Sequence, residues 1–186
     1  DTGWSKIRDP NAVLLQLLAL PTAIVLVFFT FLVCRTLFGR GMFNLGALDM
    51  AMVYWGVALL VPIHELSHAV STPSFGMSDK TVVGFWYQRL LPYAVHTDAM
   101  TRTRLIWFLV VPFLILTVMP ALGMWLLQLH SPFLFHFILV NAGGCAGDLV
   151  QVPIFLSQAP RHSIIRNRGL DSYWKAEEHD QSMHTD

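Results

Sequence analysis

Long apolar runs that alternate with shorter polar segments dominate the hydrophobic pattern of the chain. A helix needs roughly 20 mostly apolar residues to cross a lipid bilayer. Four runs reach that length, over about residues 12–34, 47–70, 105–129 and 132–156. The pattern predicts an all-α integral membrane protein with about four transmembrane helices. We expect residues 1–186 to form a single membrane-embedded domain that ends in a polar tail at 158–186.

The segment between the second and third runs, residues 71–104, is long for a connection between two helices. Within it, Thr81–Tyr87 and Leu91–Thr97 carry β-branched and aromatic residues, which favour strands. This composition predicts a small cytoplasmic β-hairpin. An exposed edge of that hairpin would bind an extended peptide by strand addition, or the hairpin would cover the membrane surface as a lid. The sequence leaves both roles open.

The composition agrees with a membrane protein and excludes two other classes. Of the 186 residues, 54% are hydrophobic and only 13% are charged, whereas soluble domains carry about 25% charged residues. A soluble globular domain of this composition would lack polar residues for its surface, and a disordered chain would be far less apolar. Because 12 basic residues balance 12 acidic ones, nothing in the charge supports binding to nucleic acid.

The positions of the basic residues predict the orientation in the membrane. Ten of them lie before the first run, between the second and third, or after the fourth: Lys6, Arg8, Lys80, Arg89, Arg102, Arg104, Arg161, Arg166, Arg168 and Lys175. Only Arg35 and Arg40 lie in the other polar segments. Lys and Arg concentrate on the cytoplasmic side of membrane proteins. We therefore expect a multi-pass cell-membrane protein with both termini in the cytoplasm.

A candidate metal-binding motif ends the second apolar run. His64 and His68 are four residues apart, with Glu65 beside the first histidine. Residues at that spacing share one face of a helix, so both imidazoles can bind one zinc ion. Glu65 would then take a proton from water activated by the metal. Ionisable residues inside an apolar run are energetically costly, which favours a functional role.

Asp148 is the best candidate for a third ligand, because catalytic zinc usually has three protein ligands. With a rise of about 1.5 Å per residue, the fourth helix places Asp148 at a depth similar to His64 and His68. Asp49 and His136 lie too far towards the outer face. The alternative is that Asp148 is a polar residue in helix packing.

The residues before Asp148 are unusually small. The segment 141–148 contains Gly143, Gly144 and Gly147, and small residues allow membrane helices to approach closely. Asn141 lies two turns before Asp148, on about the same face. It would hydrogen-bond either a substrate backbone or a neighbouring helix, and the sequence does not choose between these.

These motifs together resemble the putative zincin peptidase family of prokaryotic membrane proteins. The resemblance runs roughly from the first apolar run to Asp171 and rests on three segments: His64–His68, Gly147-Asp148, and Pro92–Thr97 with the following residues 104–112. A more distant resemblance is to site-2 proteases, which cut transmembrane substrates. This chain has Gly-Asp where those enzymes have Asp-Gly, and it has no proline between Asn141 and Asp148.

The resemblance implies His64, His68 and Asp148 as metal ligands and Glu65 as the general base. The predicted function is a zinc-dependent, membrane-embedded metalloendopeptidase with one zinc ion and an active site towards the cytoplasmic side. Its partners would be membrane lipid and a peptide or membrane-protein substrate. The alternative is a non-enzymatic zinc carrier or sensor that uses the same ligands. A di-iron oxygenase would need several histidine clusters, and the sequence offers one clustered pair.

Overall fold

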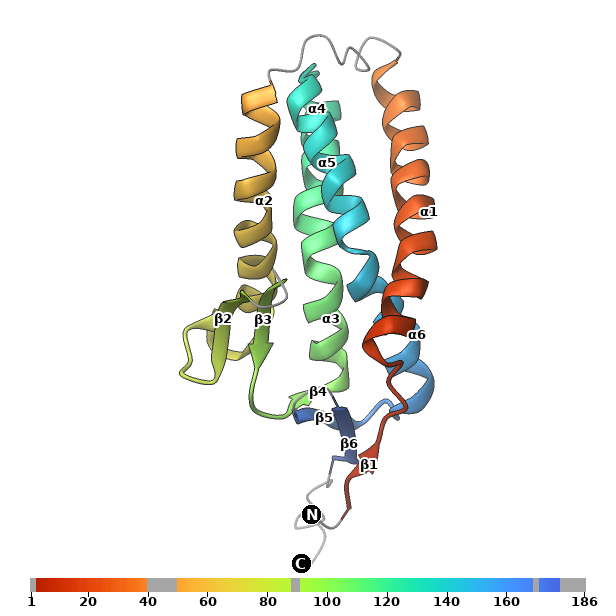
Figure 1. Cartoon of the computed structure of the whole chain (residues 1–186), viewed down its shortest axis with the longest axis vertical. Coiled ribbons are helices and arrows are strands. Elements are labelled where there is room, and N and C mark those ends of the chain that lie inside the picture. Colours follow the sequence, from red (N-terminus) through yellow and green to blue (C-terminus); the bar gives the residue numbers. More distant parts are fainter. Residues whose placement is uncertain (1–2, 40–49, 88–90, 169–170, 178–186) are drawn as a thin grey trace, which may run out of the picture.

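The computed structural model describes residues 3–39, 50–87, 91–168 and 171–177. Its helices run alongside one another, and its strands gather towards one end of the helices (Figure 1). Several predicted features lie outside the described residues: Arg40, Asp49, Arg89, the start of the second apolar run at 47–49, and the tail from 178 to 186.

Helices form over each of the four apolar runs. Their bounds are α1 Ala12–Phe38, α2 Met50–Ser71, α3 Arg102–Phe113, α4 Met119–Leu126, α5 Pro132–Gly144 and α6 Ala146–Gln158. Side-chain caps start three of them, α1, α3 and α5, and the cap of α5 is Ser131, which accepts from the backbone N–H of Leu134 (3.2 Å). Asn11 accepts a hydrogen bond from the backbone N–H of Leu14 (2.8 Å), and Thr101 accepts one from that of Arg104 (3.3 Å). Such caps satisfy backbone donors that a helix cannot pair internally.

The prediction of four continuous spans is only partly matched. Among the described residues, Val13–Phe38 and Arg102–Leu126 are long and apolar enough to cross a membrane. The second of these joins α3 and α4 through a π-helix, η4 (Leu114–Val118). The fourth predicted span is broken into α5 and α6, which are bent by 40° and count as a third span only if taken together. The helix α2 is not among them, and its last turns carry the polar residues of the metal-binding motif.

The all-α fold class was wrong, because the chain also forms two antiparallel sheets. One has the strand order β1-β6-β5-β4, from β1 (Ser5–Lys6), β4 (Met100–Thr101), β5 (Ser163–Arg168) and β6 (Asp171–Ala176). Strand β5 buries Ser163 and Ile165 while the residues between and after them stay more exposed. This alternation is typical of a sheet with one buried face. The predicted polar tail therefore contains the two central strands of a sheet that packs on the helices.

The second sheet is a hairpin at the position that the sequence predicted. Strands β2 (Thr81–Trp86) and β3 (Leu91–His96) pair antiparallel, with Gly84 opposite Tyr93. A short 3₁₀ segment, η3 (Pro73–Gly76), connects α2 to this hairpin. The hydroxyl of Thr81 hydrogen-bonds that of Thr72 (2.8 Å), which itself donates to the carbonyl of Ala69 (2.7 Å). These bonds hold the hairpin against the end of α2.

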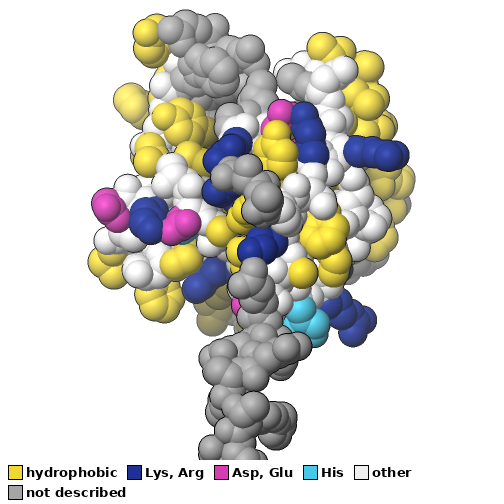
Figure 2. Space-filling view, turned by 90° about the horizontal axis from the view of Figure 1, so that it is seen from below, with side chains coloured by type: hydrophobic (Ala, Val, Ile, Leu, Met, Phe, Trp, Pro, Cys, Tyr) yellow, Lys and Arg dark blue, Asp and Glu magenta, His cyan; other side chains and the backbone are white. Residues whose placement is uncertain are grey.

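Among the described residues, most of the basic side chains lie at one end of the helix bundle. Figure 2 looks onto the end that carries the four-stranded sheet and shows Lys and Arg side chains spread across it. By contrast, Arg35 lies in the last turn of α1, at the opposite end. Between the ends, large apolar side chains point outwards: Leu17, Ile24 and Phe28 of α1 are each at least 60% exposed. Apolar surface of this extent marks a contact with lipid or another protein.

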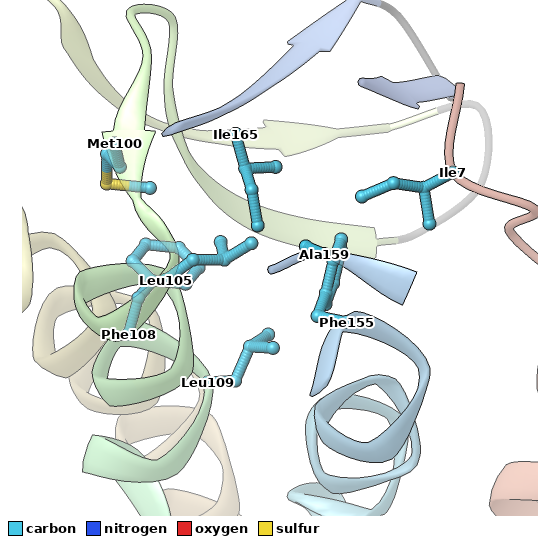
Figure 3. Close-up of a cluster of buried hydrophobic side chains, with 8 residues drawn as sticks. All are labelled: Ile7, Met100, Leu105, Phe108, Leu109, Phe155, Ala159 and Ile165. Atoms are coloured by element: carbon cyan, nitrogen blue, oxygen red, sulfur yellow. The ribbon is translucent and has the colours of Figure 1, made fainter. Parts of the chain in front are cut away.

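A hydrophobic cluster joins the four-stranded sheet to the helices (Figure 3). Its buried members are Ile7, Met100, Leu105, Phe108, Leu109, Phe155, Ala159 and Ile165. They come from the segment after β1, from β4 and β5, from α3, and from the end of α6. The cluster therefore fixes the sheet against the two helices that, with α2, surround the candidate site.

Candidate metal centre

The last two turns of α2 carry the motif that the sequence singled out. His64 and His68 lie on one face, with their ring centroids 5.0 Å apart. The hydroxyls of Ser67 and Ser71 donate to the carbonyls of His64 and His68 (2.7 and 2.6 Å). These local bonds satisfy polar groups inside the helix. The helical spacing therefore places both imidazoles on the same side of α2.

Asp148 reaches these imidazoles from α6. Its Oδ2 lies 3.3 Å from Nε2 of His64 and 3.3 Å from Nε2 of His68. One ligand atom from each of the three residues lies within 4.8 Å of the other two. Ligand atoms about 2.0–2.1 Å from a tetrahedral ion are separated by about 3.3 Å. The two distances to Asp148 thus match the spacing around a zinc ion, and all three side chains are close enough to share one.

A backbone carbonyl fixes the tautomer of His68. Its Nδ1–H donates to the carbonyl oxygen of Phe108 on α3 (2.6 Å). A carbonyl can only accept, so the proton of the neutral ring is on Nδ1 and the lone pair is on Nε2. The ring also stacks on Phe108 with centroids 4.5 Å apart, and His68 is only 4% exposed. The lone pair of Nε2 therefore faces Asp148.

The side chain of Asn141 fixes the tautomer of His64 in the same way. Its amide nitrogen donates to the carbonyl of Pro112 (3.2 Å) and to the hydroxyl of Thr117 (2.9 Å). This fixes the amide, so its oxygen Oδ1 faces Nδ1 of His64 at 3.1 Å. Because an amide oxygen only accepts, Nδ1–H of the neutral ring is the donor. The sequence left either a substrate backbone or a neighbouring helix as the partner of Asn141. The observed contacts are with neighbouring helices and with His64.

The three converging atoms are all hydrogen-bond acceptors when the histidines are neutral. Two imidazole lone pairs and a carboxylate would repel one another at 3.3 Å without a positive charge between them. The Nδ1–H of each histidine also donates a hydrogen bond to an oxygen, as the second nitrogen of zinc-binding histidines usually does. The three ligand atoms and their surroundings therefore fit a divalent metal ion.

Glu65 borders the same site. It lines a cavity of about 340 Å³ together with the three candidate ligands. Ala94 of β3 lines the same cavity. A second, mainly apolar cavity of about 210 Å³ between α2 and α5 also borders His64 and Glu65. Glu65 therefore lies beside the candidate metal position with open space on both sides.

The C-terminal sheet supplies residues that the sequence analysis missed. Asn167 of β5 and Ser172 of β6 line the 340 Å³ cavity, beside Gln151 and Phe155 of α6. The Oδ1 atom of Asn167 is buried and has no hydrogen-bond partner. Buried polar atoms of this kind are rare in native proteins. Only the alternating pattern of residues 163–168 could have placed Asn167 on a strand, and nothing local places it near Asp148.

Two other histidines lie away from the candidate metal position. His136 donates from Nδ1 to the carbonyl of Pro132, one turn earlier in α5 (2.6 Å). His96 ends β3 and hydrogen-bonds the hydroxyl of Thr81 (3.0 Å). Burial of His96 lowers its pKa from the usual value; Lys80 and Arg104 act in the same direction, and Asp98 opposes them. His96 therefore belongs to the contact between the hairpin and α2.

Comparison with known families identifies the chain. A family model described as putative zincin peptidase matches residues 57–164, which is more than half of the sequence. The chain belongs to this family. Within the zincin family match lie His64, Glu65, His68, Asn141 and Asp148, whereas the match ends before Asn167 and Ser172. Neither the search of curated proteins nor that of solved structures finds a match.

Membership in a zincin peptidase family implies a bound metal ion, of which zinc is the usual one. His64, His68 and Asp148 form a group among the described residues that can hold such an ion. The family also implies metal-dependent peptide hydrolysis, and the helices long and apolar enough to cross a bilayer associate the chain with a membrane.

Proposed function

We propose that this zincin-family protein is a membrane-embedded metalloendopeptidase with one zinc ion held by His64, His68 and Asp148. The observation that carries the proposal is the convergence of ligand atoms from His64, His68 and Asp148 beside a cavity that Glu65 also lines. Bound zinc would lower the pKa of water and polarise a peptide carbonyl.

Glu65 is the general base in this proposal. It follows His64 directly in α2, so its carboxylate lies beside the metal ligands without being one of them. Glu65 takes a proton from the attacking water and passes it to the leaving amine. Ala94 of β3 lines the cavity beside this carboxylate. A carrier or sensor would not need a proton acceptor at this position.

The substrate in this proposal lies in the 340 Å³ cavity between β3 and the C-terminal sheet. Pro92, Tyr93 and Ala94 form one wall, and Asn167 and Ser172 belong to the opposite sheet. The unpaired Oδ1 of Asn167 accepts a hydrogen bond from a substrate N–H. An extended substrate alongside β3 would use the backbone groups of an edge strand. The substrate class is therefore a peptide or an unwound segment of a membrane protein.

The proposed orientation places the sheets, both termini and the active site towards the cytoplasm. Nine of the ten basic residues on the predicted cytoplasmic side are described, and all nine lie in or next to strands or in the first turn of α3. The 10:2 distribution in the sequence supports the same orientation. In this arrangement α2 enters the bilayer from the outer side, and its polar end meets the cytoplasmic interface.

The deciding experiment compares the wild type with Glu65→Gln in proteoliposomes supplied with zinc. A peptide library is added, cleavage is followed by mass spectrometry, and bound metal is measured by elemental analysis. We expect Glu65→Gln to bind as much zinc as the wild type and to cleave nothing. Glu177→Gln, the same change at an exposed position, is the matched control and should retain activity.

The same assay separates the alternatives. Asp148→Asn and His68→Ala should lose zinc and activity together. Equal cleavage by the wild type and Glu65→Gln would refute the mechanism. Zinc binding with no cleavage by the wild type would instead support a metal carrier or sensor.

A further inference from the structure

A third cavity, of about 800 Å³, lies where α3 begins and α6 ends. Its lining shares no residue with the cavity at the candidate metal centre. One part of the lining is basic, with Arg102, Arg161 and His162, and another part is apolar, with Ile106, Trp107 and Leu156. The cavity is therefore amphipathic and separate from the proposed active site.

The two arginines of this cavity are available to an anion. Within the described part of the chain, neither Arg102 nor Arg161 forms an ion pair with a carboxylate. Arg102 is held in place by one hydrogen bond, from Nη2 to the carbonyl of Leu156 (3.3 Å), while its Nε is buried without a partner. Among the described residues that line the cavity, Glu177 is the one carboxylate. Two guanidinium groups against one carboxylate leave a net positive site, and arginine suits the geometry of phosphate.

The apolar part of the lining points to an occupant with a hydrocarbon tail. Ile106 and Trp107 lie about one turn after Arg102, in the direction of the bilayer in the proposed orientation. Trp107 is 56% exposed and Leu156 46% exposed. Tryptophan is enriched at the level of lipid headgroups, and basic pockets at the cytoplasmic ends of membrane helices bind anionic headgroups.

We propose that this cavity binds an anionic phospholipid, with its phosphate on Arg102 and Arg161 and an acyl chain along Ile106, Trp107 and Leu156. The proposal rests on the membrane embedding proposed above and does not depend on peptidase activity. A free phosphate would use the same two arginines but would gain nothing from the apolar wall. The lipid would also connect α3 to α6, the two helices that position Phe108 and Asp148 at the metal centre.

The test measures lipid binding to the purified, delipidated protein in a neutral detergent. Phosphatidylglycerol and phosphatidylcholine with identical acyl chains are added in turn, and bound lipid is counted by native mass spectrometry. We expect the wild type to prefer phosphatidylglycerol by about tenfold, because phosphatidylcholine keeps the phosphate but adds a quaternary ammonium that the two arginines repel. The Arg102→Gln/Arg161→Gln variant should lose this preference. Arg8→Gln/Arg35→Gln, which removes two charges elsewhere, should keep it.

Two further measurements make the result decisive. Trp107→Ala should weaken binding of phosphatidylglycerol, and millimolar inorganic phosphate should not displace the lipid. Displacement by phosphate, or equal lipid preference in the wild type and Arg102→Gln/Arg161→Gln, would overturn the proposal. Zinc content reports on folding of the double variant. If zinc is lost, Arg161→Gln alone at its exposed position replaces the double variant in the same comparison.

Discussion

His64 and Asn141, which are 77 positions apart in the sequence, are joined by a hydrogen bond of 3.1 Å from Nδ1 to Oδ1. This bond determines which nitrogen of His64 faces Asp148. The amide of Asn141 is itself fixed by Pro112 at the end of α3 and by Thr117 in η4. A π-helical segment, which often occurs at functional sites, thus contributes to the orientation of a candidate metal ligand on another helix.

We expect Asn141→Leu to weaken zinc binding about tenfold to a hundredfold, the usual cost of losing a partner of a metal-binding histidine. Leucine fills a similar volume but leaves Nδ1–H of His64 without an acceptor. Zinc affinity is measured by competition with a chelating dye. Asn141→Asp keeps an acceptor for His64 and should have the smaller effect. Unchanged affinity in Asn141→Leu would show that the hydrogen bond does not support metal binding.

Substitution of Asn167 tests whether the C-terminal sheet, which lines the 340 Å³ cavity, contributes to substrate binding. If its buried Oδ1 accepts a substrate hydrogen bond, Asn167→Ala should raise KM about fivefold to tenfold and leave kcat nearly unchanged. Kinetics are measured in proteoliposomes with the best-cleaved peptide of the library, and zinc content should equal that of the wild type. A fall in kcat at constant KM would contradict a role in binding the substrate.

The hairpin contact should weaken in mild acid. Burial lowers the pKa of His96, so the unfolded chain binds a proton more readily than the folded protein. The stabilising effect of neutral His96 is therefore fully present above about pH 6.5, the ordinary pKa of histidine, and is lost as the pH falls below it. Thermal unfolding in detergent at pH 7.5 and 5.5 measures this loss. His96→Gln, which cannot titrate, should lose less stability, and equal losses would exclude His96 as the cause.

Gly76 permits the tight turn that leads from α2 to the hairpin. Its φ is +78°, and an added Cβ would lie 2.8 Å from the carbonyl oxygen of Ala69. We expect Gly76→Ala to lower the free energy of unfolding by about 1–3 kcal/mol, as measured by denaturant titration. Gly123→Ala is the matched control, since nothing lies within 4 Å of its Cβ position and Gly123 is in α4. The control should be neutral or stabilising.

Local periodicity was enough to predict much of the candidate site. The spacing of His64 and His68 places both on one helical face, and counting residues along the helix gave Asp148 a matching depth. The structure brings these three side chains together. The hairpin β2–β3 was likewise predictable, because strand-forming residues lie close together in the sequence there.

The C-terminal sheet and the hydrogen bonds around the histidines required the tertiary structure. Strand β6 pairs with β1, so the two ends of the chain meet, and no local pattern encodes a pairing between Ser5 and Trp174. Apolar length alone also did not predict that α5 and α6 are bent by 40° near Cys145. The sequence determined which side chains share a helix face, because that depends on neighbours three or four residues away. Only the packing of α3, η4 and α5 decided that Asn141 and Phe108 would accept hydrogen bonds from the two histidines, because those contacts join residues that lie far apart along the chain.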